Sequence, residues 1–273
     1  MIFSMKFKIA IIGHGFVGKA VDYGFSHPNV KKQLIDPKYN KSIEDIDLDT
    51  ELIFICVPTP YEDFTIFRSV MDELQERGFM KFGSVAIKST VPPHILREYN
   101  GSTIVYNPEF LTEKSAAEQF IDPPFHIFGG DRHTVDQLER YYHQYSLCNP
   151  CPSYKLSLEE ASVVKYTINS FLATKVTFFN QIYKMCLDEG YNFNHIVNAV
   201  GSDPRIGRGH TKVPGFDGKL GFGGACFPKD TQAFCDFSNH LSVLAAAVEA
   251  NNKIRAGYDL DDREKDQKIV YIR

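Results

Sequence analysis

The stretch that decides the fold is Lys8-Ile9-Ala10-Ile11-Ile12-Gly13-His14-Gly15-Phe16-Val17-Gly18. A short apolar run followed by glycines in the spacing G-x-G-x-x-G predicts a buried strand, a tight turn and then a helix. The glycines permit the turn and let a pyrophosphate approach the backbone, and the helix start offers unpaired N–H groups. The stretch predicts either a dinucleotide-binding turn or a glycine turn without a ligand.

An acidic residue helps to separate these two interpretations. Asp36 follows the next predicted strand, 18 residues after Gly18. A carboxylate there accepts hydrogen bonds from the adenosine ribose hydroxyls, so the motif and the acid together favour a bound dinucleotide. A ribose 2′-phosphate would meet a like charge, so NAD is predicted as the cofactor rather than NADP, with Lys38 as the residue that could weaken this preference.

Strand-like and helical patterns alternate from Lys6 to about Pro150, as is typical of a parallel sheet with crossover helices. We therefore predict an α/β fold class, with a Rossmann-like doubly wound sheet in an NAD-binding domain over residues 1–157. The predicted strands are Lys8 to Ile12, Gln33 to Ile35, Leu52 to Val57, Ser84 to Lys88, Thr103 to Tyr106 and His126 to Phe128.

Residues 158–273 have a different pattern and predict a smaller all-helical domain. Leu158 to Glu189 contains neither Pro nor Gly and predicts one long helix. Such a helix has more apolar surface than a small domain covers, so we expect a homodimer through this domain. After it we predict a helix over Phe193 to Val200, a glycine-rich loop over Gly201 to Gly224 and a helical stretch from about Asp230 to Arg255.

Composition and charge exclude several classes of protein. The 273 residues contain 30 Lys and Arg against 34 Asp and Glu, so no global positive field attracts nucleic acid or an anionic membrane. No apolar stretch approaches the ~20 residues of a membrane span, and the first six residues are too short for a signal peptide, so we expect a cytoplasmic protein.

Cys148-x-x-Cys151 lacks a second pair for zinc, and no metal is predicted. The charged tail Asp259 to Lys268 is interpreted as a solvated surface segment.

Polar segments follow three of the predicted strands. Val57-Pro58-Thr59-Pro60 and Ser89-Thr90-Val91-Pro92 are expected to flank the cofactor, because ligands of open α/β sheets bind beyond the carboxyl ends of the strands; either could also be an ordinary loop. Asn107-Pro108-Glu109-Phe110-Leu111-Thr112-Glu113 follows the next strand. If this segment is helical, Glu109 and Glu113 lie one turn apart, as an acid/base pair or as solvated surface.

Two further groups of residues suggest chemistry in the second domain. Lys165 and Asn169 lie one turn apart in the long helix; Lys165 could extend to solvent, which is the commoner role, or form a donor pair for an oxyanion with Asn169. The glycine-rich segment Gly215 to Gly224 suits backbone that wraps a polar ligand. Cys226 follows it, either as a small buried hydrophobic residue, the commoner role of a lone cysteine, or as a nucleophile beside Lys229.

Together these motifs resemble the UDP-glucose 6-dehydrogenase family, the UDP-glucose/GDP-mannose dehydrogenases, from about Lys6 to Arg255. Besides the segments above, Asp203-Pro204-Arg205-Ile206-Gly207 and Gly221-Phe222-Gly223-Gly224-Ala225-Cys226-Phe227-Pro228-Lys229-Asp230 occur in family order. The last motif is highly specific. The chain departs from the family in a longer loop, Val213 to Lys219, and it ends soon after Arg255, where the family continues into a second Rossmann-like domain.

The resemblance implies oxidation of a sugar-nucleotide C6 alcohol to a carboxylate with two NAD. Cys226 matches the family nucleophile, which forms a thiohemiacetal and then a thioester. Glu109 matches the acid/base residue of hydrolysis, and Lys165 and Asn169 match the pair that holds the reacting oxygen. Thr90 and Asp230 match the pair near the catalytic water, and Arg205 an arginine that reaches the substrate phosphates across a dimer. The resemblance also implies cofactor contacts from Lys229 and Glu113, and substrate contacts from Glu113, Phe110, Leu111, Leu220, Gly221, Phe222 and Gly223.

The leading hypothesis is therefore an NAD-dependent oxidoreductase that converts UDP-glucose to UDP-glucuronate through Cys226. One alternative is a single-step β-hydroxyacid-type NAD dehydrogenase, which uses a helix Lys and Asn but does not need Cys226. A second is a catalytically weak binding protein that has lost its third domain.

Overall fold

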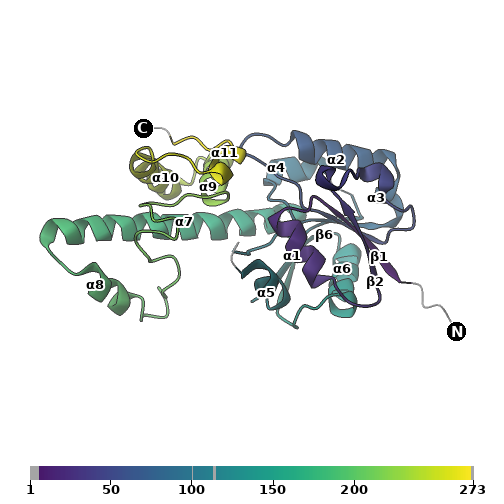
Figure 1. Ribbon diagram of the computed structural model, residues 1–273, viewed down its shortest axis with the longest axis horizontal. Helices are drawn as coiled ribbons and strands as arrows, with labels where there is room; N and C mark the ends of the chain where they lie inside the picture. The colour runs from purple at the N-terminus through teal and green to yellow at the C-terminus, as the bar shows by residue number, and fades with distance from the viewer. Residues whose placement is uncertain (1–5, 100, 113–114, 272–273) are drawn as a thin grey trace. The chain divides into compact units, whose positions relative to one another are not determined.

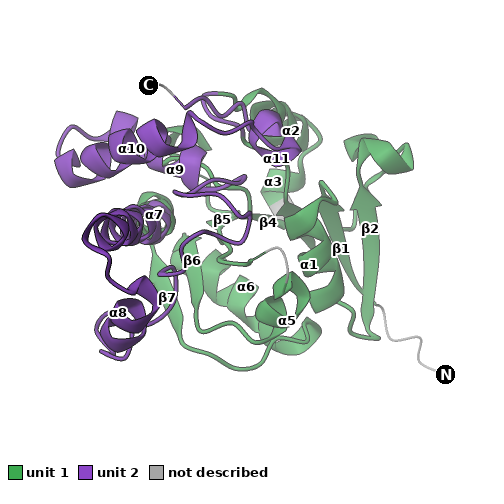
Figure 2. Cartoon of the chain, turned by 60° about the vertical axis from the view of Figure 1, so that its left-hand side comes forward, with its two compact units in different colours: residues 1–59, 63–165 green, residues 60–62, 166–273 purple. Residues whose placement is uncertain are grey.

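The computed structural model describes residues 6–99, 101–112 and 115–271 (Figure 1). The chain forms two compact units, residues 1–59 with 63–165 and residues 60–62 with 166–273 (Figure 2). The division lies within the long helix α7 (Leu158–Glu189), whereas the boundary expected from the sequence is the first residue of that helix. Among the described residues, no helix has the length and apolar composition that crossing a membrane requires.

The first unit contains a seven-stranded sheet with the order β2-β1-β3-β4-β5-β6-β7. All neighbouring strands are parallel except β5 and β6. This confirms the predicted α/β fold class with a doubly wound sheet. The strands are β1 (Phe7–Ile12), β2 (Val30–Ile35), β3 (Leu52–Ile55), β4 (Ser84–Ile87), β5 (Ile104–Tyr106), β6 (His126–Gly130) and β7 (Ser153–Leu156).

Two features of the sheet differ from the prediction. β6 is antiparallel to β5, with Val105 opposite Gly130, because an apolar run does not encode the direction of its strand. β7 was not predicted, because its four residues lie at the edge of the sheet and carry the exposed Tyr154 instead of a continuous apolar run.

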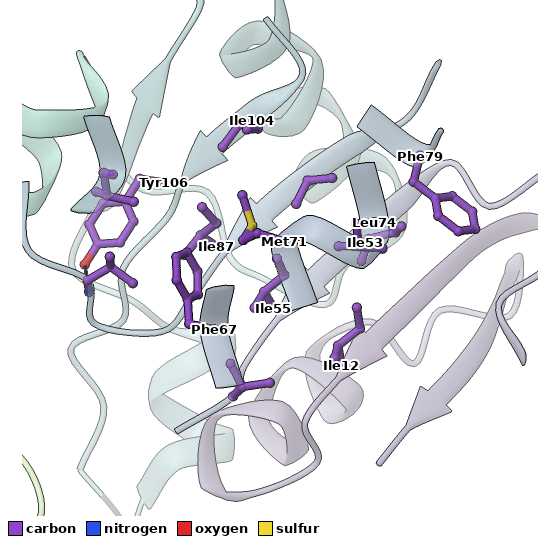
Figure 3. Close-up of a cluster of buried hydrophobic side chains, with 14 of the residues drawn as sticks. Ile12, Ile53, Ile55, Phe67, Met71, Leu74, Phe79, Ile87, Ile104 and Tyr106 are labelled. Carbon is purple, nitrogen blue, oxygen red and sulfur yellow. Dashed lines mark hydrogen bonds between the residues drawn. The ribbon is translucent and has the colours of Figure 1, made fainter. Parts of the chain in front are cut away.

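Apolar side chains cover both faces of the sheet, as the alternation along each strand requires. Ile53 and Ile55 point into a cluster with Phe67, Met71 and Leu74 of α2 (Thr65–Glu76), shown in Figure 3. Leu52 and Phe54 of the same strand point into the opposite cluster. That cluster includes residues of α1 (Phe16–Gly24), α5 (Ala116–Ile121) and α6 (Arg132–Tyr145). The other short helices of this unit are η1 (Pro37–Tyr39), η2 (Ile43–Asp45), α3 (Phe79–Phe82), α4 (Pro93–Leu96) and η3 (Arg97–Tyr99).

The second unit is helical. The long helix α7 and α8 (Phe193–Val200) have the predicted bounds. The predicted stretch from Asp230 to Arg255 is instead two helices, α9 (Phe227–Phe237) and α10 (Ser242–Arg255), separated by a short polar segment without glycine or proline to signal the break.

The charged tail also differs from the prediction. It contains a short helix, α11 (Asp262–Asp266), in which Glu264 is fully buried, so the segment is not entirely a solvated surface. The periodicity of so short a helix gives no signal for the face that is covered.

Candidate active site

The glycine turn between β1 and α1 has the geometry that the sequence predicts. Gly13 adopts a φ of +84°, and a Cβ on Gly18 would lie 2.0 Å from the carbonyl oxygen of Gly13. A Cβ on Gly15 would meet no heavy atom within 4 Å, so the backbone is approachable there. Gly15 is the N-cap of α1 and makes no side-chain cap, so the N–H groups of Phe16 and Val17 remain available to an anion.

The carboxylate of Asp36 lies beside this turn. It accepts hydrogen bonds from the backbone N–H groups of His14 at 2.6 Å and Lys38 at 3.0 Å. Burial raises the pKa of Asp36, but these hydrogen bonds and the Lys38 ammonium outweigh it, and the pKa is lowered. Lys38 Nζ lies 3.6 Å from the carboxylate and donates to the carbonyl oxygen of His14. The turn, the helix start and an ionised carboxylate fit NAD.

The His14 side chain has a role that sequence reasoning did not anticipate. It is 8% exposed, with Nε2 at 3.0 Å from Asp22 and Nδ1 at 2.8 Å from the Tyr39 hydroxyl. These contacts fix the turn from both sides. The sequence gave no signal for them, because His14 occupies a variable position of the glycine motif.

The segments after β3 and β4 are joined to each other. Thr59 Oγ1 donates to the carbonyl oxygen of Thr90 at 2.8 Å, and Ser89 Oγ donates to that of Val57 at 2.6 Å. β3 and β4 are parallel neighbours, so these segments lie at the carboxyl edge of the sheet, where Pro58 also lies. Pro60 belongs to the second unit.

Glu109 and Lys165 form a buried pair in the first unit. Glu109 is 8% and Lys165 3% exposed, and Lys165 Nζ lies 3.4 Å from the carboxylate and donates to the Glu109 carbonyl oxygen. Lys165 therefore does not extend to solvent, contrary to the commoner role of an isolated lysine, and its Nζ lies 5.1 Å from the centre of the Phe110 ring. The Glu109 carboxylate also accepts from the N–H of Leu111 at 2.6 Å.

The segment around Glu109 is not helical. Residues 107–112 have no regular structure, so the helix that would place Glu109 and Glu113 one turn apart is absent over those six residues. Glu113 lies outside the described residues. The N–H of Leu111 bonds to the Glu109 side chain, which favours a turn over a helix.

A buried lysine that sequence reasoning missed, Lys88, binds the first residue of the 107–112 segment. Lys88 Nζ donates to Asn107 Oδ1 at 3.0 Å, and the Tyr142 hydroxyl donates to the same oxygen at 2.6 Å. Burial lowers the pKa of Lys88 to about 8. These bonds fix Asn107, two residues before Glu109.

The second unit brings together three other predicted residues. Asn169 Nδ2 and Lys229 Nζ each donate to a different oxygen of the Asp230 carboxylate, both at 2.6 Å. Asp230 is 1% exposed, and Asn169 and Lys229 are 6% and 9% exposed. A carboxylate at such a depth is retained where donors satisfy it, and these two donors do so.

Cys226 lies at the start of α9, where its carbonyl oxygen accepts from the N–H of Asp230 at 3.0 Å. Its side chain is exposed, whereas the other five cysteines are buried or of intermediate exposure. The interpretation of Cys226 as a small buried hydrophobic residue is therefore wrong. An exposed thiol at a helix start has the access that a nucleophile requires.

The glycine-rich loop before Cys226 is held by side chains. The N–H of Gly221 donates to Asn180 at 2.8 Å, and the N–H of Phe222 donates to Asn251 at 2.7 Å. Phe222 itself is buried, whereas Leu220 and Gly223 are partly exposed. Sequence reasoning missed both asparagines; a polar residue on the apolar face of a helix was the available signal.

Arg205 is 87% exposed at its side chain and pairs with Asp203 at 2.6 Å within the same loop. Among the described residues, no ion pair or hydrogen bond joins Arg205 to Cys226 or to Asp230. No cluster of three potential metal ligands occurs in the part of the chain that the structure describes.

Two family models match the chain. Residues 37–146 match the NAD-binding domain of the UDP-glucose/GDP-mannose dehydrogenase family, and residues 159–255 match its central domain. The chain belongs to this family. The match to the NAD-binding domain confirms the predicted cofactor. The glycine turn and Asp36 precede the matched residues, and the structure provides their geometry.

Individual proteins that are similar to this chain include UDP-glucose dehydrogenases. The chain is 29% identical over 252 residues to a UDP-glucose 6-dehydrogenase of Bacillus subtilis, TuaD, covering 83% of this chain and 52% of that protein. A solved UDP-glucose dehydrogenase from Pyrobaculum islandicum is 27% identical with a TM-score of 0.74, covering 93% of this chain and 69% of that chain. The chain thus spans about half the length of the curated relatives it matches.

The fold alone does not separate the members of this family from other dehydrogenases. A 3-hydroxyisobutyrate dehydrogenase of Mycobacterium tuberculosis, 16% identical, has a TM-score of 0.67 and covers 94% of this chain and 97% of its own. The family is therefore shown by the two family models and not by the fold, and the residues of the site bear on the chemistry.

Proposed function

We propose that the chain is an NAD-dependent nucleotide-sugar 6-dehydrogenase that oxidises UDP-glucose to UDP-glucuronate. The observation that carries the proposal is the exposed thiol of Cys226 at the start of α9, four residues before the buried Asp230. A single-step hydroxyacid dehydrogenase does not need such a thiol. Family membership and the names of the relatives support UDP-glucose as the substrate.

The first oxidation removes a hydride and a proton from the C6 alcohol and gives an aldehyde. When bound, NAD accepts the hydride in this step and in the second oxidation. Lys165 and Asn169, four residues apart in α7, are the donors that we assign to the C6 oxygen. Glu109 and Asp230 keep these donors oriented before the substrate arrives.

The second oxidation runs through Cys226. Its sulfur adds to the aldehyde carbon and the thiol proton passes to the aldehyde oxygen, which gives a thiohemiacetal. Loss of the hydride from carbon and of the hydroxyl proton to solvent then gives a thioester. Water attacks the thioester carbon, the C–S bond breaks, and the thiol and the carboxylate are released. We assign to Glu109 the role of accepting a proton from this water. We assign to Thr90 and Asp230 the role of orienting the water.

The test is a cofactor-reduction assay of the purified chain with a panel of UDP- and GDP-sugars and a β-hydroxyacid. The proposal requires UDP-glucose to be the best substrate and two NADH to form for each acid. One NADH for each product, with a hydroxyacid preferred, would support the single-step alternative. NAD binding without turnover on any compound would support a binding protein.

We also propose that the chain acts as a homodimer through α7. Phe171, Phe178 and Met185 are 67%, 54% and 43% exposed and follow each other at intervals of seven residues. Apolar residues at this spacing form one line along a helix, which is typical of a helix–helix contact. A second copy of α7 would cover this line.

Subunit exchange tests the dimer and the role of Arg205 together. Inactive Cys226→Ser protein is mixed with inactive Arg205→Ala protein. If Arg205 serves the partner's site, a mixed dimer has one site with both lesions and one with neither. Roughly a quarter of the native activity should return after random exchange. Demonstrated exchange without any return of activity, or an active monomer, would contradict the shared site.

A further inference from the structure

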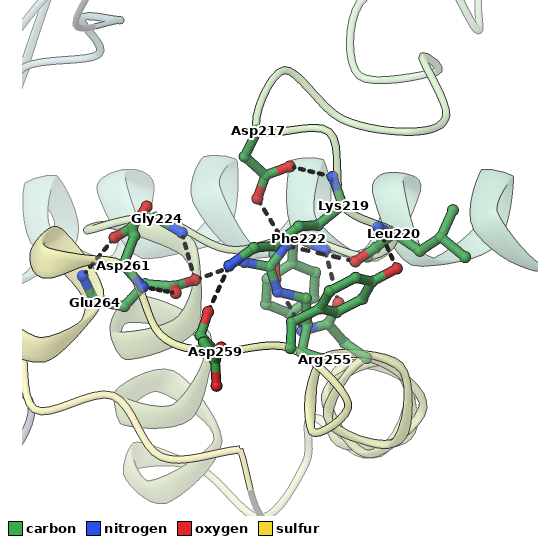
Figure 4. A network of polar contacts seen from close by, with 12 residues as sticks. Asp217, Lys219, Leu220, Phe222, Gly224, Arg255, Asp259, Asp261 and Glu264 are labelled. Atoms are coloured by element: carbon green, nitrogen blue, oxygen red, sulfur yellow. Dashed lines mark hydrogen bonds and ion pairs between the residues drawn. The ribbon is translucent and has the colours of Figure 1, made fainter.

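A buried ion pair lies against the glycine-rich loop of the second unit (Figure 4). Arg255 at the end of α10 is 1% exposed, and Glu264 of α11 is 0% exposed. Arg255 Nη2 donates to Glu264 Oε1 at 2.7 Å, and its Nη1 donates to Asp217 at 2.7 Å. Removing two charges from water is costly, so a pair at this depth needs further donors and acceptors.

The Glu264 carboxylate has such donors. Its Oε1 also accepts from the N–H of Gly224 at 3.1 Å and from the Tyr271 hydroxyl at 2.8 Å. Its Oε2 accepts from the N–H of Asp261 at 2.9 Å. With Arg255, the carboxylate has four donors, and one of them, the N–H of Gly224, belongs to the loop that leads into Cys226, two residues further on.

The loop backbone packs directly against the pair. A Cβ on Gly223 would lie 2.0 Å from Arg255 Nη2 and 2.5 Å from Glu264 Oε1. Gly221 and Phe222 are held by Asn180 and Asn251, both within the residues that match the central domain of the family. Glu264 lies beyond those residues, which end at 255.

We propose that residues 256–271, which we call the C-terminal segment, position the Cys226 loop, and that Glu264 is the positioning residue. Its carboxylate holds Gly224 and the Arg255 guanidinium, so the backbone that enters α9 keeps one conformation when a substrate reaches the thiol. The role of Cys226 as nucleophile rests on the proposed function. The hold of Glu264 on the loop does not.

Neighbouring acidic residues supply matched variants. Glu264→Gln removes the charge of the pair. Asp261→Ala is milder, because Asp261 Oδ1 accepts from the N–H of Glu264 at 2.9 Å and caps α11. Asp262→Ala, one residue further on, is the control, because that side chain is 96% exposed. Asp261→Ala keeps the experiment decisive if Glu264→Gln does not fold.

Two measurements report on the loop without any substrate. The first is the rate at which iodoacetamide alkylates Cys226, determined by peptide mass spectrometry with Cys235 as the internal reference. The second is deuterium exchange in the peptide that contains Gly221 to Cys226. Both test variants should change the Cys226-to-Cys235 rate ratio and raise the loop exchange by about fivefold or more, the size expected for one lost cap. Asp262→Ala should change neither.

Activity adds a third readout where the chain turns over UDP-glucose. The two test variants should lower kcat severalfold and leave KM for NAD unchanged, because the cofactor turn belongs to the other unit. An inactive native chain would contradict the proposed function, while alkylation and exchange would still test the hold of Glu264. A folded Glu264→Gln or Asp261→Ala with unchanged Cys226 alkylation and loop exchange would overturn the inference. So would equal increases at Cys226, Cys235 and α7, which would indicate general loosening.

Discussion

The two glycine loops of the molecule are held in different ways. In the first, Gly13 to Gly18, the glycines pack backbone against backbone: the N–H of Gly13 donates to Ile35, and Gly18 lies against the carbonyl oxygen of Gly13. Among the described residues, side chains bind the backbone of this loop only at His14, through the nearby Asp36 and Lys38. In the second, Gly221 to Gly224, the backbone N–H groups bind side chains from α7, α10 and α11. A local backbone arrangement can be predicted from the spacing of its glycines, whereas a loop held by distant side chains cannot.

The largest expected effect separates what the two loops do. Cys226→Ser should lower oxidation of UDP-glucose to the acid roughly 10³-fold or more, since serine is a far poorer nucleophile at neutral pH. NAD affinity, measured by calorimetry, should not change, because the first loop is untouched. Cys235→Ser, a change in the same helix, is the matched control. Near-normal turnover of Cys226→Ser would remove the thioester route.

The next effect tests how the second loop is held. Glu264→Gln should lower the free energy of unfolding by roughly 3 kcal/mol, which is the lower end for a broken buried ion pair. The lower end applies because Arg255 retains Asp217 as an ion-pair partner. Burial raises the pKa of Glu264, but hydrogen bonds from Asp261, Tyr271, Gly224 and Arg255 outweigh it, and the pKa is lowered from its usual value.

The lowered pKa gives the sign of the pH dependence. The ionised Glu264 stabilises the fold above its unfolded pKa, and this contribution is lost as the pH falls through the lower folded pKa. The difference in unfolding free energy between the native chain and Glu264→Gln should therefore be at its maximum at pH 7 and should decrease below about pH 4.5. Urea unfolding across this range measures it. A difference that stays constant down to pH 3 would contradict the assignment.

A matched pair of variants tests the first loop. Gly18→Ala places a Cβ against the backbone of Gly13, which cannot move aside, and should cost roughly 1–3 kcal/mol of unfolding free energy. Gly15→Ala meets no atom within 4 Å and has a φ of −76°, which alanine adopts. It should leave the unfolding midpoint unchanged and weaken NAD binding, because the methyl group occupies the approach of the pyrophosphate. Equal stability of the two variants would contradict this account.

The sequence could predict features that depend on neighbouring residues, but not contacts between residues distant in the sequence. The α7 helix from Leu158 to Glu189 and the α8 helix from Phe193 to Val200 could be predicted with their bounds, because periodicity and flanking residues act locally. The burial of Lys165 against Glu109, 56 residues apart, and of Glu264 against Arg255 could not. A titratable side chain looks exposed in a sequence until the fold provides its partner.

The smallest expected effect concerns the side chain that balances Asp36. Lys38 Nζ lies 3.6 Å from the Asp36 carboxylate and is 41% exposed, so its attraction for a 2′-phosphate is largely screened. Lys38→Ala should raise the ratio of kcat/KM for NAD to that for NADP only about 2–5-fold, as expected for one exposed charge. Lys41→Ala removes the same charge three residues further on, where the ammonium pairs with Asp45, and is the control.

Because Asp36 also accepts the N–H of His14, Asp36→Asn should lower the same ratio of kcat/KM for NAD to that for NADP and loosen the turn. A ratio that falls in Lys38→Ala would mean that the lysine helps to select NAD, and Asp36 would then act as an anchor of the first loop rather than as the cofactor discriminator.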